Sequence, residues 1–267
     1  MRRLRAIILL AACAAPLGTG SCRPAAEEPL LRLAARGLRF TLPPEVAAGL
    51  TRVRFVNQDP VWHEASLVRF TSAEGTLERY IALARSGEEY PAFAEDLGGV
   101  SFLAPGDSAE VLIRLPPGRY AVICWHQDHV LQGMGAEFEV RGDRMRWPDP
   151  AQATPLPLRD FAIPPLSPRP GHELLHVTND GPSEHELAIL RLDAGRTLAD
   201  FMAWRTAGEA GPPPGRTIAG TAALRSGAEV WLDVTWAPGR YAVICLLEDP
   251  AKRYHTQLGM QREFTIP

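Results

Sequence analysis

The sequence predicts an all-β protein made of two tandem Greek-key β-sandwich domains, each interrupted by a short excursion helix. The first observation is a long internal repeat, because Gly-Arg-Tyr-Ala-Val-Ile-Cys occurs at 118–124 and again at 239–245. The second is composition: 25 Pro and 23 Gly in 267 residues favour many turns over long helices. The third is a series of short alternating apolar segments, which are typical of half-buried strands.

The repeat covers whole domains, because Cys124 and Cys245 lie 121 positions apart. A chain of 267 residues can hold two domains of ordinary size, each with its own core. We expect the first domain at 30–143 and the second at 158–267. The proline-rich stretch 144–157 lacks periodicity and is predicted to be a semi-rigid linker.

Strands and helices within each copy follow from apolar spacing. The clearest alternation is at 51–56, at 110–115 and at Val230, Leu232 and Val234. A Pro-Gly turn precedes the repeated Tyr-Ala-Val-Ile-Cys strand in both copies. Helical spacing is found for Leu77, Tyr80, Ile81 and Ala84 and, in the second copy, for Leu198, Phe201 and Met202. Thr197 and Asp200 have the spacing of a capping box.

The chain begins with a predicted export signal, residues 1–22, in which a basic head precedes a short apolar segment. This segment is too short for a spanning helix. Thr19-Gly-Ser-Cys22 favours lipidation at Cys22, with Leu10-Ala-Ala-Cys13 and simple cleavage near Cys22 as the alternatives. We therefore expect an exported, periplasmic or extracytoplasmic protein that associates with a membrane through a lipid anchor. The net charge of -3 argues against nucleic acid as a partner.

Cys124 and Cys245 are the only cysteines after the leader. Two cysteines in an oxidising compartment usually form a disulfide. Here they occupy equivalent positions of two repeats, so each is expected deep in its own domain. A metal is the better explanation for two such thiols.

In each copy the cysteine is followed by a histidine and a methionine, and a His-Glu pair stands upstream. A thiolate, two imidazoles and a weak thioether form the ligand set of a type 1 copper centre. The candidate ligands are His63, Cys124, His129 and Met134 in the first copy and His185, Cys245, His255 and Met260 in the second.

These motifs resemble the cupredoxins, and the resemblance covers most of each half. The spacing Cys-x4-His-x4-Met of the first copy is similar to that of the phytocyanin branch. The spacing Cys-x9-His-x4-Met of the second is similar to the long loop of two-domain copper nitrite reductases. The resemblance implies one copper per domain, held by the residues named above, and single-electron transfer with a redox partner protein.

The sequence departs from the family beside the first histidine. The family often has an asparagine there, whose side chain braces the cysteine loop, whereas this chain has Glu64 and Glu186. Asn57 and Asn179 lie six residues before the histidines instead. A glutamate at this position could also bind the metal directly and give a non-blue site, so that alternative stays open.

Further histidines and tryptophans lie near the motifs. His126 stands between two ligands and is interpreted as an exposed loop residue, with an alternate ligand or an electron-exit group as the alternatives. His172 and His176 are expected at the surface. Trp62 and Trp125 flank candidate ligands, either as a shield against water or as ordinary core residues.

Three other functions compete with electron transfer. Two-domain copper enzymes place a histidine directly before the blue-site cysteine, where this chain has Ile123 and Ile244. Copper storage or delivery favours methionine-rich sites, and the chain has 5 Met. A scaffold with one or both sites metal-free, serving protein interaction, is the remaining alternative. We predict a non-enzymatic electron-transfer protein.

Overall fold

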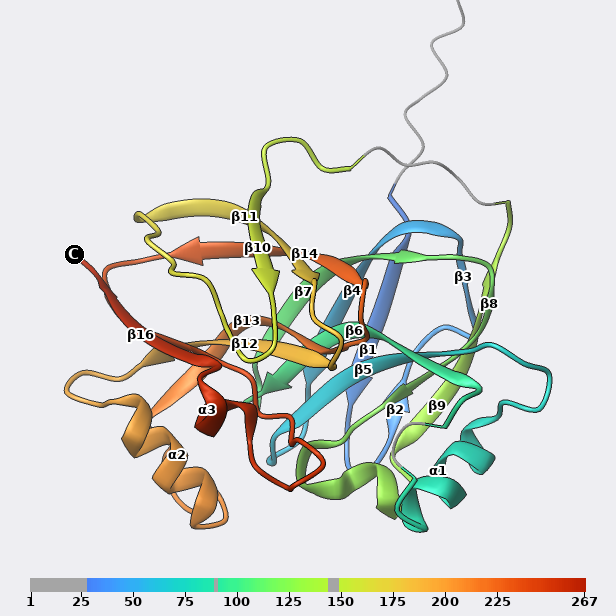
Figure 1. Ribbon diagram of the computed structural model, residues 1–267. Helices are drawn as coiled ribbons and strands as arrows, with labels where there is room; N and C mark the ends of the chain where they lie inside the picture. Colours follow the sequence, from blue (N-terminus) through green and yellow to red (C-terminus); the bar gives the residue numbers. More distant parts are fainter. Residues whose placement is uncertain (1–27, 89–90, 144–148) are drawn as a thin grey trace, which may run out of the picture.

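A computed structural model describes residues 28–88, 91–143 and 149–267 and shows two β-sheets packed face to face (Figure 1). Consecutive strands repeatedly cross from one sheet to the other, as Greek-key connections do. The predicted all-β sandwich is therefore confirmed. The export signal and both candidate lipidation cysteines lie outside the described residues.

The first sheet has seven strands, and both repeats contribute to it. In spatial order its strands are β10 (Thr154–Leu158), β11 (Gly171–Asn179), β14 (Glu229–Trp236), β7 (Ser108–Leu115), β4 (Gly49–Asn57), β1 (Leu30–Ala35) and β2 (Phe40–Thr41).

The second sheet has nine strands, and it carries the candidate ligands. Its order is β16 (Gln261–Ile266), β15 (Gly239–Ile244), β12 (His185–Leu192), β13 (Gly215–Leu224), β6 (Ala94–Leu103), β5 (His63–Phe70), β8 (Gly118–Ile123), β9 (Gly135–Arg141) and β3 (Glu45–Ala47).

Both sheets continue from one repeat into the other. In the seven-stranded sheet β7 pairs with β14, and in the nine-stranded sheet β6 pairs with β13 through Leu97 and Leu224. Buried side chains of both repeats join in one apolar cluster between the sheets. The expectation of a separate core in each domain is therefore wrong, because the strands at the junction extend the sheets and close the gap between the two cores.

One helix of each repeat covers the outer face of the nine-stranded sheet (Figure 1). Helix α1 (Leu77–Arg85) begins after Thr76, whose hydroxyl accepts a hydrogen bond from the Arg79 N–H. Helix α2 (Leu198–Thr206) begins with the predicted capping box, in which Thr197 and Asp200 satisfy each other's backbone N–H groups. Both predicted helices are confirmed.

The predicted linker differs from expectation at its C-terminal end. Residues 154–157 belong to strand β10, which pairs in parallel with β11. Two prolines suggested a linker, but β10 is an edge strand of the sheet, and an edge strand tolerates residues without an N–H donor. Among the described residues, no helix is long and apolar enough to cross a membrane.

Candidate metal centres

The four candidate ligands of the first repeat converge at one end of the nine-stranded sheet. His63 opens β5 and Cys124 directly follows its neighbour β8, so their pairing brings imidazole and thiol together. His129 lies in the 3-10 helix η1 (His126–Gln132), and Met134 stands immediately before β9. All four are buried, with His129 the most exposed at 6%.

Three donor atoms of this group lie within bonding range of a common point. Cys124 Sγ is 3.7 Å from His63 Nδ1 and 3.5 Å from His129 Nδ1, and the two Nδ1 atoms are 3.1 Å apart. Metal–donor bonds of about 2.0–2.3 Å at open angles place neighbouring donors about 3–4 Å apart. The observed spacings fit a single ion.

The second repeat forms the same arrangement. His185 opens β12 and Cys245 follows β15, while His255 begins the short helix α3 (His255–Leu258). Cys245 Sγ and His185 Nδ1 are each 3.3 Å from His255 Nδ1. Among the described residues, these two triads are the groups of histidine, cysteine and acidic side chains whose spacing suits a metal ion.

A glycine turn precedes each methionine and directs the chain back toward the ligand histidine. Gly133 has φ 98° and Gly259 has φ 122°, a region that favours glycine. The Met134 N–H then bonds to the His129 carbonyl at 3.0 Å, and the corresponding bond from Met260 is 2.9 Å. Both methionine side chains are fully buried in the apolar cluster that contains the cysteines. This turn explains why the His-x4-Met tail is the same in both copies.

The extra residues of the second ligand loop form a self-contained turn. Asp249 accepts hydrogen bonds from the Ala251 and Arg253 backbone N–H groups, each at 2.9 Å, and pairs with the Arg253 side chain at 2.6 Å. The loop closes where the His255 N–H bonds to the Leu247 carbonyl at 2.8 Å. The longer spacing therefore leaves the position of His255 unchanged relative to Cys245.

Burial sets the protonation states of the triads. It lowers the pKa of His63 to about 4 and lowers the pKa values of His129, His185 and His255 in the same way. These imidazoles are neutral near pH 7, which is the form that binds metals. Burial also raises the thiol pKa of both cysteines, so a metal must displace a proton to bind them.

A carboxylate faces the outer nitrogen of the first histidine in both repeats, and the motif analysis missed it. In the first repeat Asp59 lies 3.7 Å from His63 Nε2 and accepts a hydrogen bond from the Gly37 N–H. In the second, Asp160 Oδ1 lies 2.7 Å from His185 Nε2. Asp160 is close enough to fix the tautomer of His185, so that Nδ1 faces the metal position, whereas Asp59 makes only a longer contact with His63.

The two carboxylates come from positions that are not equivalent in the repeat. The pairing of β1 with β4 and of β10 with β11 aligns Gly37 with Asp160 and Asp59 with Gly181. Carboxylate and glycine are thus exchanged between the two positions. A side chain at Gly181 would collide with the Asp160 carboxylate, so the glycine is required where Asp160 is present. The repeat motif did not reveal these two carboxylates, because neither position holds the same residue type in both repeats.

Glu64 and Glu186 brace the cysteine strands. Glu64 Oε1 accepts the Trp125 N–H at 2.8 Å, and Glu186 Oε1 accepts the Leu246 N–H at 2.7 Å. Their own N–H groups each lie 3.4 Å from the neighbouring cysteine sulfur. Adjacent residues of a strand face opposite sides, so the glutamates face away from the metal positions. The alternative that they ligate the metal is not supported.

Asn57 and Asn179 fix the loop before the first histidine. Asn57 Nδ2 donates to the Val61 and Leu103 carbonyls at 2.8 and 2.9 Å, and its Oδ1 accepts the Asp59 N–H at 3.0 Å. Asn179 makes the three corresponding bonds in the second repeat. These asparagines therefore hold the loop that positions the histidine.

His126 differs from its predicted exposure. It is buried, and its Nε2 lies 2.9 Å from Glu209 Oε2 of the second repeat. The reason is the continuous sheet, which brings the end of α2 against η1. Trp62 is likewise buried between the repeats, with its ring 5.5 Å from that of Trp204. His172 is exposed as predicted, whereas His176 is partly covered and stacks on a tryptophan.

No protein-family model and no curated protein sequence match this chain. Several solved structures align with it at low scores. A dithionite-reduced auracyanin from Roseiflexus castenholzii aligns with 22% identity and a TM-score of 0.32, over 42% of this chain and 97% of its own. A copper nitrite reductase from Nitrosomonas europaea aligns with 13% identity and a TM-score of 0.26, over 89% and 93% of the two chains. A multicopper oxidase aligns with 12% identity and a TM-score of 0.25, over 89% and 88%. At TM-scores this low, the chemistry of those proteins cannot be assigned to this chain. The function is therefore argued from the positions of this chain's own donor atoms.

Proposed function

We propose that this protein holds one copper ion in each repeat and passes single electrons. The observation that carries the proposal is the duplicated buried triad of one cysteine and two histidine Nδ1 atoms, with a buried methionine beside each. Soft sulfur with imidazole suits copper, and the thioether disfavours hard cations. Bound copper would supply a one-electron couple between its two common oxidation states.

The protein's contribution is a site that is already assembled. The ligands come from strand ends and short braced loops, so their positions are fixed by the sheet and by the Asn57 and Asn179 hydrogen bonds. The buried imidazoles are neutral without metal, and the surrounding apolar cluster excludes water. A rigid, dry site keeps ligand movement small when an electron is gained or lost.

We propose a non-catalytic role. The evidence for it is the type of residue that directly precedes each cysteine. Ile123 packs in the apolar cluster under α1, and Ile244 packs in the one under α2. Neither position offers a donor that could join the triad to a second metal. Copper-loaded protein should therefore show no turnover with nitrite or with oxygen and a reductant.

The proposal is tested by titrating the metal-free protein with Cu(II) while recording the visible spectrum. We expect an intense blue band at two equivalents that ascorbate bleaches and mild oxidant restores. Cys124→Ala and Cys245→Ala should each remove about half of the band, and the double variant should remove all of it. His176→Ala, outside both triads, serves as the control. Colourless stoichiometric uptake would indicate storage or a non-blue site, and absence of uptake would indicate a metal-free scaffold.

We propose further that the protein is exported, anchored by lipid at Cys22 and served by a redox partner protein. The support is the basic and apolar pattern of residues 1–22 together with two thiols that are buried and unpaired. Mass spectrometry of the mature protein tests the anchor. Acylation at Cys13, or cleavage without acylation, would contradict it.

A further inference from the structure

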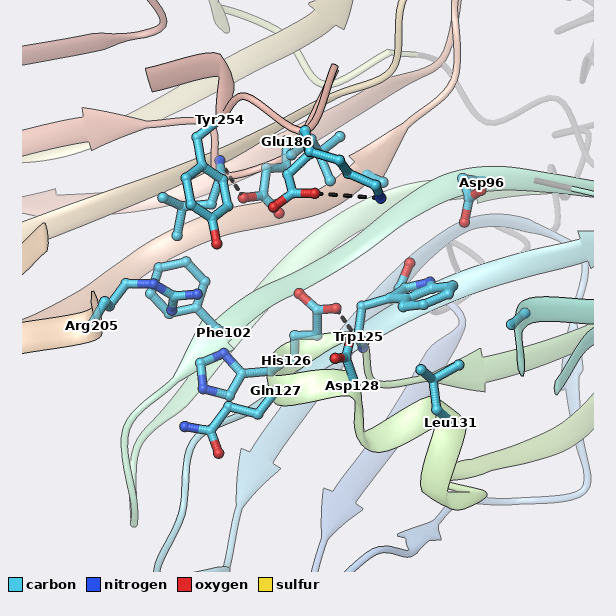
Figure 2. Close-up of a pocket in the computed structure, with 18 of the residues that line it drawn as sticks. Asp96, Phe102, Trp125, His126, Gln127, Asp128, Leu131, Glu186, Arg205 and Tyr254 are labelled. Atoms are coloured by element: carbon cyan, nitrogen blue, oxygen red, sulfur yellow. Dashed lines mark hydrogen bonds and ion pairs between the residues drawn. The ribbon is translucent and has the colours of Figure 1, made fainter. Parts of the chain in front are cut away.

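A cavity of about 830 Å³ lies between the two repeats, on the outer face of the nine-stranded sheet. The end of α1 and the η1 segment form one wall, and the end of α2 and the loop 246–254 form the other. Figure 2 shows Trp125 and Asp128 on one side of this space, with Arg205, Glu186 and Tyr254 on the other. Its size is within the usual range of pockets for small molecules.

Buried carboxyl groups from both repeats line the floor of the cavity. Glu64 and Glu186 line it from the two repeats, and each uses one oxygen for its backbone hydrogen bond. Three basic side chains also line the cavity, and each is engaged. Arg205 lies 3.1 Å from Glu209 and over the Phe102 ring at 5.2 Å. Lys252 lies 3.4 Å from Glu248, and Arg85 donates to the Leu131 carbonyl at 2.8 Å.

Two further polar side chains of the first repeat line the cavity without partners. Asp96 is 6% exposed and accepts no hydrogen bond within the described part of the chain. Ser66 is 1% exposed, and its hydroxyl has no partner among the same residues. Asp96 corresponds to Thr217 of the second repeat and Ser66 corresponds to Ala188, so the fold does not require a charge at the first position or a hydroxyl at the second. Unpaired buried polar groups are costly, and they point to a ligand that completes them.

The type of ligand follows from the rest of the lining. The carboxylates of this cavity are not among the close donor groups that suit a bare metal ion, which in the described residues are the two triads alone. The rings of Phe102, Trp125 and Tyr254 also line the cavity. Aromatic faces and carboxylates together favour an organic cation, which can be attracted to both.

We propose that this cavity binds a small organic cation with an ammonium or guanidinium group beside an apolar or aromatic body. The charged end would lie toward Asp96 and the two glutamates, and the body would lie against the aromatic wall. This inference does not depend on copper, because none of the contacts that carry it comes from a candidate metal ligand.

The test is calorimetric titration of the metal-free protein with benzylamine, with benzyl alcohol as the neutral probe of equal shape. We expect saturable binding of benzylamine and at least tenfold weaker binding of benzyl alcohol. Asp96→Asn should weaken benzylamine at least tenfold, and Ser66→Ala should weaken it less. Asp180→Asn, an exposed carboxylate outside the cavity, is the control and should change nothing.

A second variant keeps the test decisive if Asp96→Asn does not fold. Ala223 lines the cavity and is not fully buried, so Ala223→Lys would place a cation inside it without removing a polar group. Benzylamine binding should then be lost. Equal affinity for benzylamine and benzyl alcohol, no binding of either, or unchanged affinity in folded Asp96→Asn or Ala223→Lys would overturn the proposal. The blue absorption band of the copper-loaded protein is measured separately, so copper binding is tested independently of this proposal.

Discussion

The exchanged carboxylate predicts a defined loss and a specific rescue at the second site. Asp160→Gly installs the residue of the first repeat and removes the acceptor 2.7 Å from His185 Nε2. His185 is fully buried, so its Nε2–H would be left without a partner. Leaving a buried donor unpaired costs about 1–3 kcal/mol. Loss of such a partner typically lowers metal affinity about 10–100-fold, or about 1.4–2.7 kcal/mol.

The assay is competition for Cu(II) against a chelator in a Cys124→Ala background, so that the second site alone is observed. Asp160→Gly should lower the affinity, and adding Gly181→Asp should recover part of it. The recovery is expected because the double variant reproduces the arrangement of the first repeat, in which Asp59 at the equivalent position faces His63 Nε2. Gly181→Asp alone should destabilise the site, since two carboxylates would compete for one space. Exposed Asp180→Gly is the matched control.

The refuting result is unchanged copper affinity in Asp160→Gly. A double variant no better than Asp160→Gly would also contradict the reasoning, because it would show that position 181 cannot supply the carboxylate. The corresponding Asp59→Gly should have a smaller effect at the first site, because Asp59 lies 3.7 Å from the His63 nitrogen.

Three further predictions concern the fold and the uptake of metal. Thr197→Ala should lower the free energy of unfolding by about 1 kcal/mol in denaturant titrations, because it removes a reciprocal cap, and Thr76→Ala should cost no more. Trp62→Ala should lower the free energy of unfolding by about 3–5 kcal/mol, because Trp62 packs on Phe201 and Trp204 across the repeats. A loss below about 1 kcal/mol would contradict that contact. Copper uptake near pH 7 should release one proton per site, since the thiols are protonated and the imidazoles already neutral, and affinity should rise about tenfold per pH unit. Calorimetry in two buffers of different ionisation enthalpy measures the protons, and release near zero would contradict the thiol assignment.

The candidate ligands could be predicted because the same residue types occur in the same order in both repeats. Cys124 and Cys245 stand in identical heptapeptides, and the histidine and methionine follow each in the same order. The periodicity of the strands and helices is equally local, so α2 and its cap were predictable from Thr197 to Asp200. A feature that depends on neighbours along the chain leaves a local pattern that sequence analysis can detect.

The features that sequence analysis missed depend on contacts between distant segments. Strand β10 is defined by its pairing with β11, and its prolines suggested a linker when considered alone. The burial of His126 depends on Glu209, 83 positions away. The pairing of β6 with β13 rests on Leu97 and Leu224, which carry no special signature. The last two features result from the way the two repeats pack, which neither repeat encodes separately, whereas β10 depends on a pairing within the second repeat.

The continuous sheet also gives Glu64 and Glu186 two roles that one substitution should separate. Each braces the N–H after a cysteine with one oxygen. Both face the same cavity because β5 and β12 belong to one sheet and present them on the same face. Glu186→Gln keeps an oxygen that can accept the Leu246 N–H but removes the charge. It should therefore preserve the blue band and weaken benzylamine, whereas Glu186→Ala should impair both. Loss of copper in Glu186→Gln would mean that the charge itself supports the metal site, and unchanged benzylamine affinity would remove Glu186 from the cation site.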